Sequence, residues 1–128
     1  MYKIAVSRFF QAQHQLPDSE DLLTKGCANN HGHTFLAKVI AFGDNKRHGM
    51  VVDYRGIKNK IDIFDHNSVN DIFKQNSFDE PATSENIAKF IFESIAKEYP
   101  DLKDLEVSIC EGYQGEESSS WVTYYGEQ

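Results

Sequence analysis

Hydrophobic and polar residues alternate along the first segment of the chain, "YKIAVSRFFQAQHQL", which is typical of a β-strand with one buried face. The buried face would carry Ile4, Val6, Phe10, Ala12 and His14, and the opposite face Lys3, Ser7, Gln11 and Gln13. A second strand is predicted from "HTFLAKVIAFG", because it is rich in β-branched and aromatic residues and precedes the turn-like "GDNKRHG". The first third of the chain therefore predicts a long hairpin with an irregular polar segment between its strands.

The spacing of hydrophobic residues then changes from the two-residue period of a strand to the 3.6-residue period of an α-helix. In "MVVDYRGIKNKIDIF", Ile57, Ile61 and Phe64 follow one another at i, i+4 and i+7, and Asp53 is suited to cap the helix. After a polar loop, "TSENIAKFIFESIAKEYP" predicts a second helix capped by Thr83 or Ser84. Its buried stripe would consist of Ile87, Phe90, Ile91 and Ile95, and Pro100 would mark its end.

Two further segments, "LEVSICE" and "SSWVTYYG", read as strands, so the predicted order is β-β-α-α-β-β in one domain spanning residues 1–128. The packing that fits this order is an α+β fold in which a four-stranded antiparallel sheet carries both helices on one face. The other face and the two sheet edges would be poorly covered. We expect oligomerisation to bury them, because a closed ring of sheets removes the edges altogether.

Composition narrows the classes of function. With 128 residues, 40% hydrophobic and 26% charged, the chain has the size and make-up of a globular domain. A net charge of −7 argues against a general nucleic-acid binder, and no apolar run approaches the roughly 20 residues of a membrane span. The start "MYKIAVSRFF" lacks the pattern of a signal peptide. Together with only two cysteines, this favours reduced thiols and a cytoplasmic location.

Three histidines are candidates for a metal site. His31 and His33 are two apart, so their imidazoles would project from the same side of a strand, and His14 ends the strand expected beside it. Three imidazoles with a fourth position open are a catalytic zinc arrangement. The alternative is a pair of solvent-exposed histidines with no ligand, since H-x-H alone is a weak signal.

Other side chains break their local pattern. Cys110 fits a small apolar filler, but Cys27 lies in a polar loop beside Lys25, where a lowered thiol pKa would suit a base or nucleophile. Asp65 and His66 are either an acid–base couple or simple loop residues. Glu111 follows the alternating residues Leu105, Val107 and Ile109 on one strand face. It is either at the exposed end of the sheet or placed to accept N–H groups of a planar ligand.

Taken together and in order, these motifs resemble the 6-pyruvoyl-tetrahydropterin synthase and 6-carboxytetrahydropterin synthase family. The matching residues are F-x-A-x-H (Phe10, Ala12, His14), C-x-x-x-H-G-H (Cys27, His31, Gly32, His33), G-x-V-x-D (Gly49, Val51, Asp53), D-H-x-x-x-N-D (Asp65, His66, Asn70, Asp71), T-x-E-N-I-A (Thr83 to Ala88) and Glu111 on a late strand.

The resemblance implies the tunnelling fold, assembled as a homohexamer of two stacked trimers, with active sites between subunits. It implies Zn²⁺ on His14, His31 and His33, and 7,8-dihydroneopterin triphosphate as the small-molecule substrate. Substrate binding would fall to Glu111, on the amino-pyrimidine edge of the pterin, and to Thr83. Acid–base chemistry would fall to Cys27 and to the Asp65–His66 pair.

The expected product is 6-carboxy-5,6,7,8-tetrahydropterin, on the route to the deazapurine bases of tRNA. The alternatives are the 6-pyruvoyl product, a pterin-binding paralogue without that activity, and a structural zinc domain in which Cys27 closes the site. The chain departs from the family pattern at Gln13, at Pro81-Ala82-Thr83 and at Gly112, which bears on contacts to the pterin and the triphosphate. The retained Cys27 argues against the subclass that carries glutamate there and makes a hydroxymethyl product.

Overall fold

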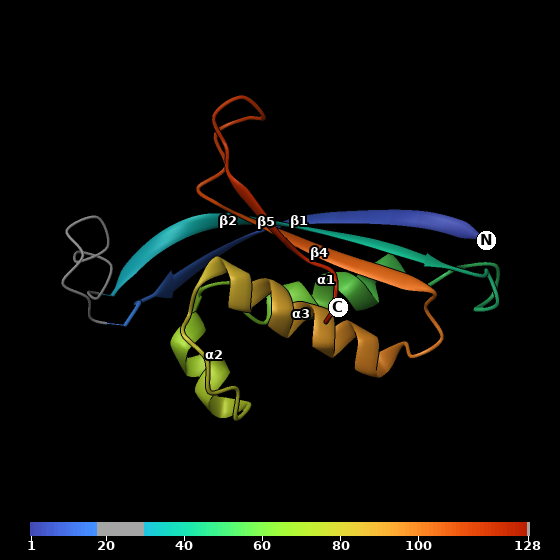
Figure 1. The fold of residues 1–128 in the computed structure, drawn as a ribbon, viewed down its shortest axis with the longest axis horizontal. Helices are drawn as coiled ribbons and strands as arrows, with labels where there is room; N and C mark the ends of the chain where they lie inside the picture. The colour runs from blue at the N-terminus through green and yellow to red at the C-terminus, as the bar shows by residue number, and fades with distance from the viewer. Residues whose placement is uncertain (18–29, 128) are drawn as a thin grey trace.

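The computed structural model describes residues 1–17 and 30–127 and folds them into one curved sheet with three helices beneath it (Figure 1). The strands are β1 (Tyr2–His14), β2 (His31–Gly43), β3 (Asn67–Ser68), β4 (Asp104–Glu111) and β5 (Trp121–Tyr124). The helices are α1 (Tyr54–Asp62), α2 (Val69–Gln75) and α3 (Ser84–Glu98). The expected α+β class and the two long N-terminal strands are confirmed.

The sheet has the strand order β3-β1-β2-β4-β5, so the expected four-stranded sheet is extended by a short fifth strand. All neighbours are antiparallel except β3, which runs parallel to the end of β1 and pairs with it only at Ala12 and Gln13. A two-residue strand has no alternation of its own, and its pairing depends on the neighbouring strand rather than on its sequence.

Local capping explains where the helices begin. Asp53 accepts a hydrogen bond from the Arg55 N–H at 2.9 Å and starts α1, and Thr83 accepts one from the Asn86 N–H at 3.3 Å and starts α3. Helix α1 ends at Asp62, short of the Phe64 that we expected within it.

Helix α2 lies where the sequence predicted a polar loop. Ser68 caps it, and Val69 and Phe73, spaced i and i+4, are buried. Seven residues make fewer than two turns, which is too short for the helical period to show in the sequence.

The core lies between the inner face of the sheet and the helices. The inner face buries Phe10, Phe35, Val39 and Val107, and α3 contributes Ile87, Ala88, Ile91 and Ile95. Beneath β1, four phenylalanine rings (Phe64, Phe73, Phe78 and Phe90) pack edge-on and stacked against one another. Phe90 is only partly buried, so it forms the margin of the expected α3 stripe rather than its centre.

The opposite face of the sheet carries no helix in the described part of the chain (Figure 1). Phe9 is 56% exposed and Trp121 40% exposed on this face. Cross-strand register joins Phe9 to Leu36, Leu36 to Cys110 and Cys110 to Trp121, so these side chains form one apolar row across the sheet.

None of the helices in the described ranges is long and apolar enough to cross a bilayer.

Candidate metal centre

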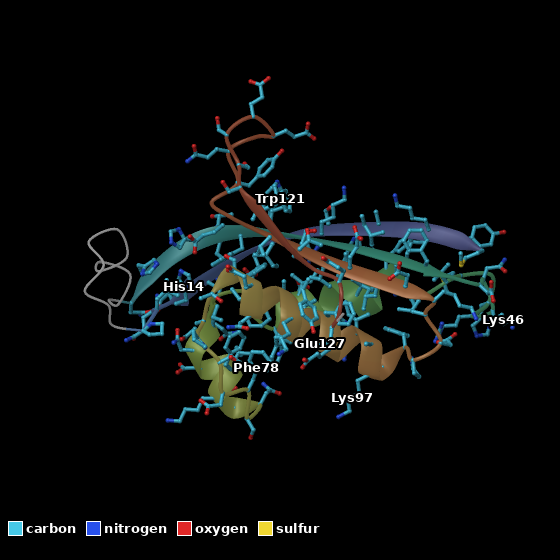
Figure 2. The ribbon with its side chains drawn as sticks, viewed as in Figure 1. His14, Lys46, Phe78, Lys97, Trp121 and Glu127 are labelled. Atoms are coloured by element: carbon cyan, nitrogen blue, oxygen red, sulfur yellow. The ribbon has the colours of Figure 1, made fainter. Side chains whose placement is uncertain are left out.

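The register of the first hairpin brings three histidines to one end of the sheet. His14 is the last residue of β1 and pairs directly with His31, the first residue of β2, while His33 pairs with Ala12. Since all three project toward the helices, their rings meet at the edge of the core, at the opposite end of the molecule from Lys46 (Figure 2). One ligand nitrogen from each lies within 4.8 Å of the other two. The predicted convergence of these three side chains is therefore present.

The His14 ring is held in one orientation by the main chain. It is 2% exposed, and its Nδ1 lies 2.7 Å from the carbonyl oxygen of Ala82. A carbonyl only accepts, so Nδ1 carries a proton and donates it, and in the neutral ring the lone pair is then on Nε2, which faces His31 and His33. A hydrogen bond from the second ring nitrogen to a carbonyl is what orients most metal-bound histidines.

The Ala82 carbonyl is itself fixed by its neighbours. Ala82 is buried, and Thr83, the N-cap of α3, follows it directly. On the other side, the carbonyl of Pro81 accepts hydrogen bonds from the Thr83 N–H at 2.9 Å and from Nδ2 of Asn86 at 3.0 Å. The Pro81-Ala82-Thr83 segment, where the chain departs from the family pattern, thus serves as the rigid support of His14.

Glu111 ends β4 with its carboxylate against this cluster. Its Oε1 lies 3.0 Å from Nε2 of His14 and 3.7 Å from Nε2 of His33. The His14 contact has an ion-pair distance but not the alignment of a hydrogen bond, and Nε2 is the one buried side-chain polar atom in the described residues without a hydrogen-bond partner. A bare imidazole nitrogen and a carboxylate oxygen repel each other at this distance unless a proton or a cation lies between them.

The electrostatics of the cluster follow from this contact. Burial alone would lower the pKa of His14, but the Glu111 carboxylate and the Ala82 carbonyl outweigh it, so the pKa is raised above 6.5. The contact with His14 lowers the pKa of Glu111 below 4.5, against the opposing effect of burial. Burial lowers the pKa of His33, which keeps its imidazole neutral and able to bind a cation.

These observations fit a zinc ion. Three imidazole nitrogens match the donor preference of Zn²⁺, and the buried Nε2 of His14, which has no hydrogen-bond partner in the described residues, faces a carboxylate oxygen that favours a cation between them. The residues that would hold the ion are His14, His31 and His33. The Glu111 carboxylate lies against these histidines. Its expected hydrogen bonds to the amino-pyrimidine edge of a pterin stay a prediction.

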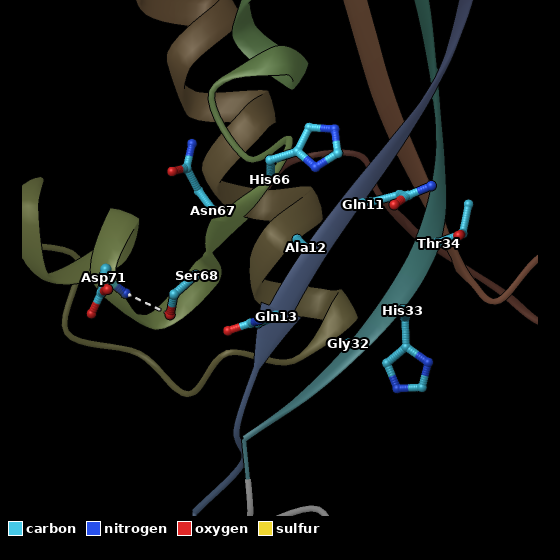
Figure 3. A pocket seen from close by; sticks show the side chains of 10 residues that line it. All are labelled: Gln11, Ala12, Gln13, Gly32, His33, Thr34, His66, Asn67, Ser68 and Asp71. Carbon is cyan, nitrogen blue, oxygen red and sulfur yellow. Dashed lines mark hydrogen bonds between the residues drawn. The ribbon is translucent and has the colours of Figure 1, made fainter.

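A pocket of about 610 Å³ opens next to the histidines, large enough for a small organic molecule (Figure 3). Its lining comes from β1 (Gln11, Ala12, Gln13), from β2 (Gly32, His33, Thr34) and from the segment after α1 (His66, Asn67, Ser68, Asp71). The candidate metal ligand His33 and the acid–base candidate His66 therefore border one cavity. In Figure 3 their rings lie on opposite sides of the β1–β2 ladder and do not point toward each other.

The Asp65–His66 pair is fastened to β1. Oδ1 of Asp65 accepts the Gln11 N–H at 2.9 Å, and the His66 N–H donates to the Gln11 carbonyl at 2.6 Å. His66 has φ +58°, a left-handed conformation that is uncommon outside glycine, and its side chain is 77% exposed. Nε2 of His66 is 3.6 Å from Oδ2 of Asp65, beyond hydrogen-bond length, so the couple is close but not aligned within one chain.

The remaining predicted site residues have different outcomes. Cys27 lies outside the described residues. Thr83, expected to bind substrate, uses its hydroxyl oxygen to cap α3, and a substrate contact by the same group stays a prediction. Cys110 is fully buried, as expected for an apolar filler. The sequence reasoning did not identify the Ala82 carbonyl, because a main-chain atom carries no residue-type signal.

Comparison with known proteins supports one assignment. A family profile described as 6-pyruvoyl tetrahydropterin synthase matches residues 3–127. The chain is 31% identical over 109 residues, 82% of this chain and 85% of the other, to an Archaeoglobus fulgidus protein named for 6-carboxy-5,6,7,8-tetrahydropterin synthase activity. It is also 39% identical over 87 residues, 64% of this chain and 70% of the other, to a dihydroneopterin monophosphate aldolase of Pyrococcus furiosus.

The fold agrees with these sequence matches. The structure of Caenorhabditis elegans 6-pyruvoyl tetrahydropterin synthase superposes with a TM-score of 0.64 at 26% identity, covering 99% of this chain and 98% of that one. The Plasmodium vivax enzyme superposes with a TM-score of 0.63 at 15% identity over 97% and 98% of the two chains, a likeness of fold alone. The chain belongs to the 6-pyruvoyl tetrahydropterin synthase family.

Proposed function

We propose that the protein is a zinc-dependent carbon–carbon lyase acting on 7,8-dihydroneopterin triphosphate. With uptake of water, it would release acetaldehyde and triphosphate and leave 6-carboxy-5,6,7,8-tetrahydropterin, a precursor of the queuosine base. The observation that carries the proposal is the buried Nε2 of His14, which has no hydrogen-bond partner among the described residues and converges with His31 and His33 beside a pocket of about 610 Å³. The Archaeoglobus fulgidus relative, by its name, points to the same product.

The chemistry requires protons to leave side-chain carbons that bear hydroxyl groups, and such C–H bonds are only weakly acidic. A zinc ion held by the three histidines would supply Lewis acidity to the hydroxyl oxygens of the substrate. Cys27 would take up and return a proton as a thiolate, a role that rests on its motif and on the neighbouring Lys25. The Asp65–His66 pair would exchange the second proton as an acid–base couple.

The exposure of His66 supports a site shared between copies of the chain. Within one chain its ring is 77% exposed and turned away from His33, so an acid–base role needs a surface that brings another copy's metal ligands to it. Among the described residues, β1 pairs on its outer side only with the two residues of β3, which leaves most of a 13-residue edge open. Together with the apolar row from Phe9 to Trp121, this edge favours the proposed homohexamer.

Two related reactions are the alternatives. Elimination of triphosphate without carbon–carbon cleavage would give the 6-pyruvoyl product. The Pyrococcus furiosus relative favours a second cleavage reaction, since that protein is named for an aldolase acting on the monophosphate. The two substrates differ in the number of phosphates, whereas the hydroxyl-bearing carbons of the pterin side chain, which zinc would contact, are the same in both.

A product assay distinguishes these reactions. The purified, zinc-loaded protein is incubated separately with dihydroneopterin triphosphate and monophosphate, and the products are identified by mass spectrometry. We expect 6-carboxytetrahydropterin, acetaldehyde and triphosphate from the first substrate, and no turnover by Cys27→Ala with zinc still bound. A Cys110→Ala variant is the matched control, because that thiol is fully buried and lies on the sheet face away from the helices and the histidines. Full activity of Cys27→Ala would contradict its role, and a hydroxymethyl product from the monophosphate would favour the aldolase.

A further inference from the structure

The side chain of Asn70 binds the main chain immediately after the metal ligand His14. Its Oδ1 accepts the Gln15 N–H at 2.9 Å, and its Nδ2 donates to the Gln15 carbonyl at 3.0 Å. One carboxamide thus satisfies both main-chain groups of Gln15, as a neighbouring strand residue would. It does so one residue beyond His14–His31, the last pair of the β1–β2 ladder.

Asn70 completes a series of contacts along the end of β1. Asp65 and His66 bond the main chain of Gln11, β3 pairs with Ala12 and Gln13, and Asn70 follows at Gln15. The segment that carries the acid–base pair therefore runs beside the strand that carries His14 and is joined to it on both sides of that histidine.

His14 needs such support, because the ladder ends there. Its ring is held by the Ala82 carbonyl, but the direction of its Cα–Cβ bond depends on the main chain at residues 14 and 15. Free rotation of that main chain would turn Nε2 away from His31 and His33. Groups that orient a metal ligand without touching the metal alter its affinity by 10- to 100-fold in other proteins.

We propose that Asn70 is a positioning residue of the metal centre, which fixes the main chain at Gln15 and so directs Nε2 of His14 toward the ion. The inference rests on the metal site of the proposed function but not on the identity of the substrate. In this proposal, Asn70 of α2 also fixes the position of the Asp65–His66 segment relative to the three histidines.

The test compares Asn70, in the first turn of α2, with Asn76, the residue that caps the C-terminal end of that helix. Asn70→Ala removes both bonds to Gln15, and Asn70→Asp keeps the acceptor but sets a carboxylate oxygen against the Gln15 carbonyl. Asn76→Ala is the matched control, since Nδ2 of Asn76 donates to the Ile72 carbonyl at 2.8 Å at the C-terminal end of the same helix. Zinc affinity is measured by competition with a chelator, and ligand geometry by the visible absorption spectrum of the cobalt-substituted protein.

We expect zinc affinity to fall about tenfold or more in Asn70→Ala, with an altered cobalt spectrum. Asn70→Asp should show the same changes and serves as the second variant if Asn70→Ala does not fold. Asn76→Ala should lose thermal stability while keeping the wild-type affinity and spectrum. Wild-type zinc affinity and an unchanged spectrum in folded Asn70 variants would overturn the inference. If the wild-type protein binds zinc but converts no pterin, the proposed function fails and the role of Asn70 stands.

Discussion

The carboxylate of Asp65 is predicted to have two separable roles. Its Oδ1 anchors the Gln11 N–H at 2.9 Å, and its Oδ2 lies 3.6 Å from Nε2 of His66. Asp65→Asn keeps an oxygen that can accept from Gln11 but removes the negative charge beside His66. Asp65→Ala removes both the anchor and the charge. The two variants therefore separate the contribution to folding from the contribution to catalysis.

The size of the folding effect follows from the contact. A hydrogen bond to a charged group contributes roughly 1.5–3 kcal/mol, and the Asp65 side chain is 40% exposed, so water replaces part of it. We expect Asp65→Ala to cost about 1 kcal/mol and Asp65→Asn less than about 0.5 kcal/mol. For 128 residues the unfolding entropy is about 0.27 kcal/mol per kelvin, so 1 kcal/mol lowers Tm by about 4 °C.

Thermal unfolding and turnover of the pterin triphosphate are measured on the same samples. Asp65→Asn should melt within about 2 °C of wild type. Its kcat should fall about 100-fold or more, as expected when an acid–base couple loses its charge. Asp62→Asn is the control, because Asp62 also ties a helix to β1, through an exposed ion pair with Arg8. Wild-type turnover by Asp65→Asn would refute the acid–base role and leave Asp65 as an anchor alone.

Three further predictions concern the cap, the ion and the pH. In thermal unfolding, Thr83→Ala should lower the free energy of unfolding by about 1 kcal/mol because the α3 cap is lost, whereas Thr83→Ser should keep the cap and the wild-type stability. Equal stability of the two variants would contradict the capping role of Thr83. In calorimetry, zinc at about 100 times its Kd should raise the free energy of unfolding of the wild type by about 2.7 kcal/mol. An equal increase in His33→Ala would contradict the assignment of His33 to the metal site. The pKa of His14 is raised above 6.5, so protons compete with the metal as soon as the pH falls to that raised pKa. Zinc affinity from chelator titration should therefore begin to fall above pH 6.5 as the pH decreases, and a pH-independent affinity would contradict this.

The strands that carry the site could be predicted because their signal is local. Alternation predicted β1 with His14 on its buried face, and β-branched and aromatic residues predicted most of β2. The spacing of two placed His31 and His33 on the same side of a strand. The caps of α1 and α3 were equally local, since an N-cap side chain bonds a main-chain group within three residues.

The short elements could not be predicted in the same way. Strand β3 exists through its pairing with β1, more than 50 residues earlier in the chain, and α2 is shorter than two helical turns. Both lie in a stretch rich in Asn, Asp and Ser, which is typical of loops. Tertiary contacts, rather than local preference, determine their structure.

The supports of the metal site were also beyond sequence reasoning. The Ala82 carbonyl is 68 residues from His14, and Asn70 is 55 residues from Gln15. Residue type predicts which side chain binds a metal, but not which distant main-chain atom orients it. Glu111 shows the same limit, because its strand face was predictable while its contact with His14 and His33 was not.

The most direct test of the account is X-ray absorption at the zinc edge on the purified wild-type protein. We predict three imidazole nitrogens and one exchangeable oxygen at about 2.0–2.1 Å, with the nitrogen contribution reduced in a His31→Ala variant. A sulfur neighbour at about 2.3 Å would instead indicate a closed structural site completed by a cysteine. That result, or a protein that retains no zinc, would contradict the claim that these three histidines hold a catalytic ion with one position open for substrate.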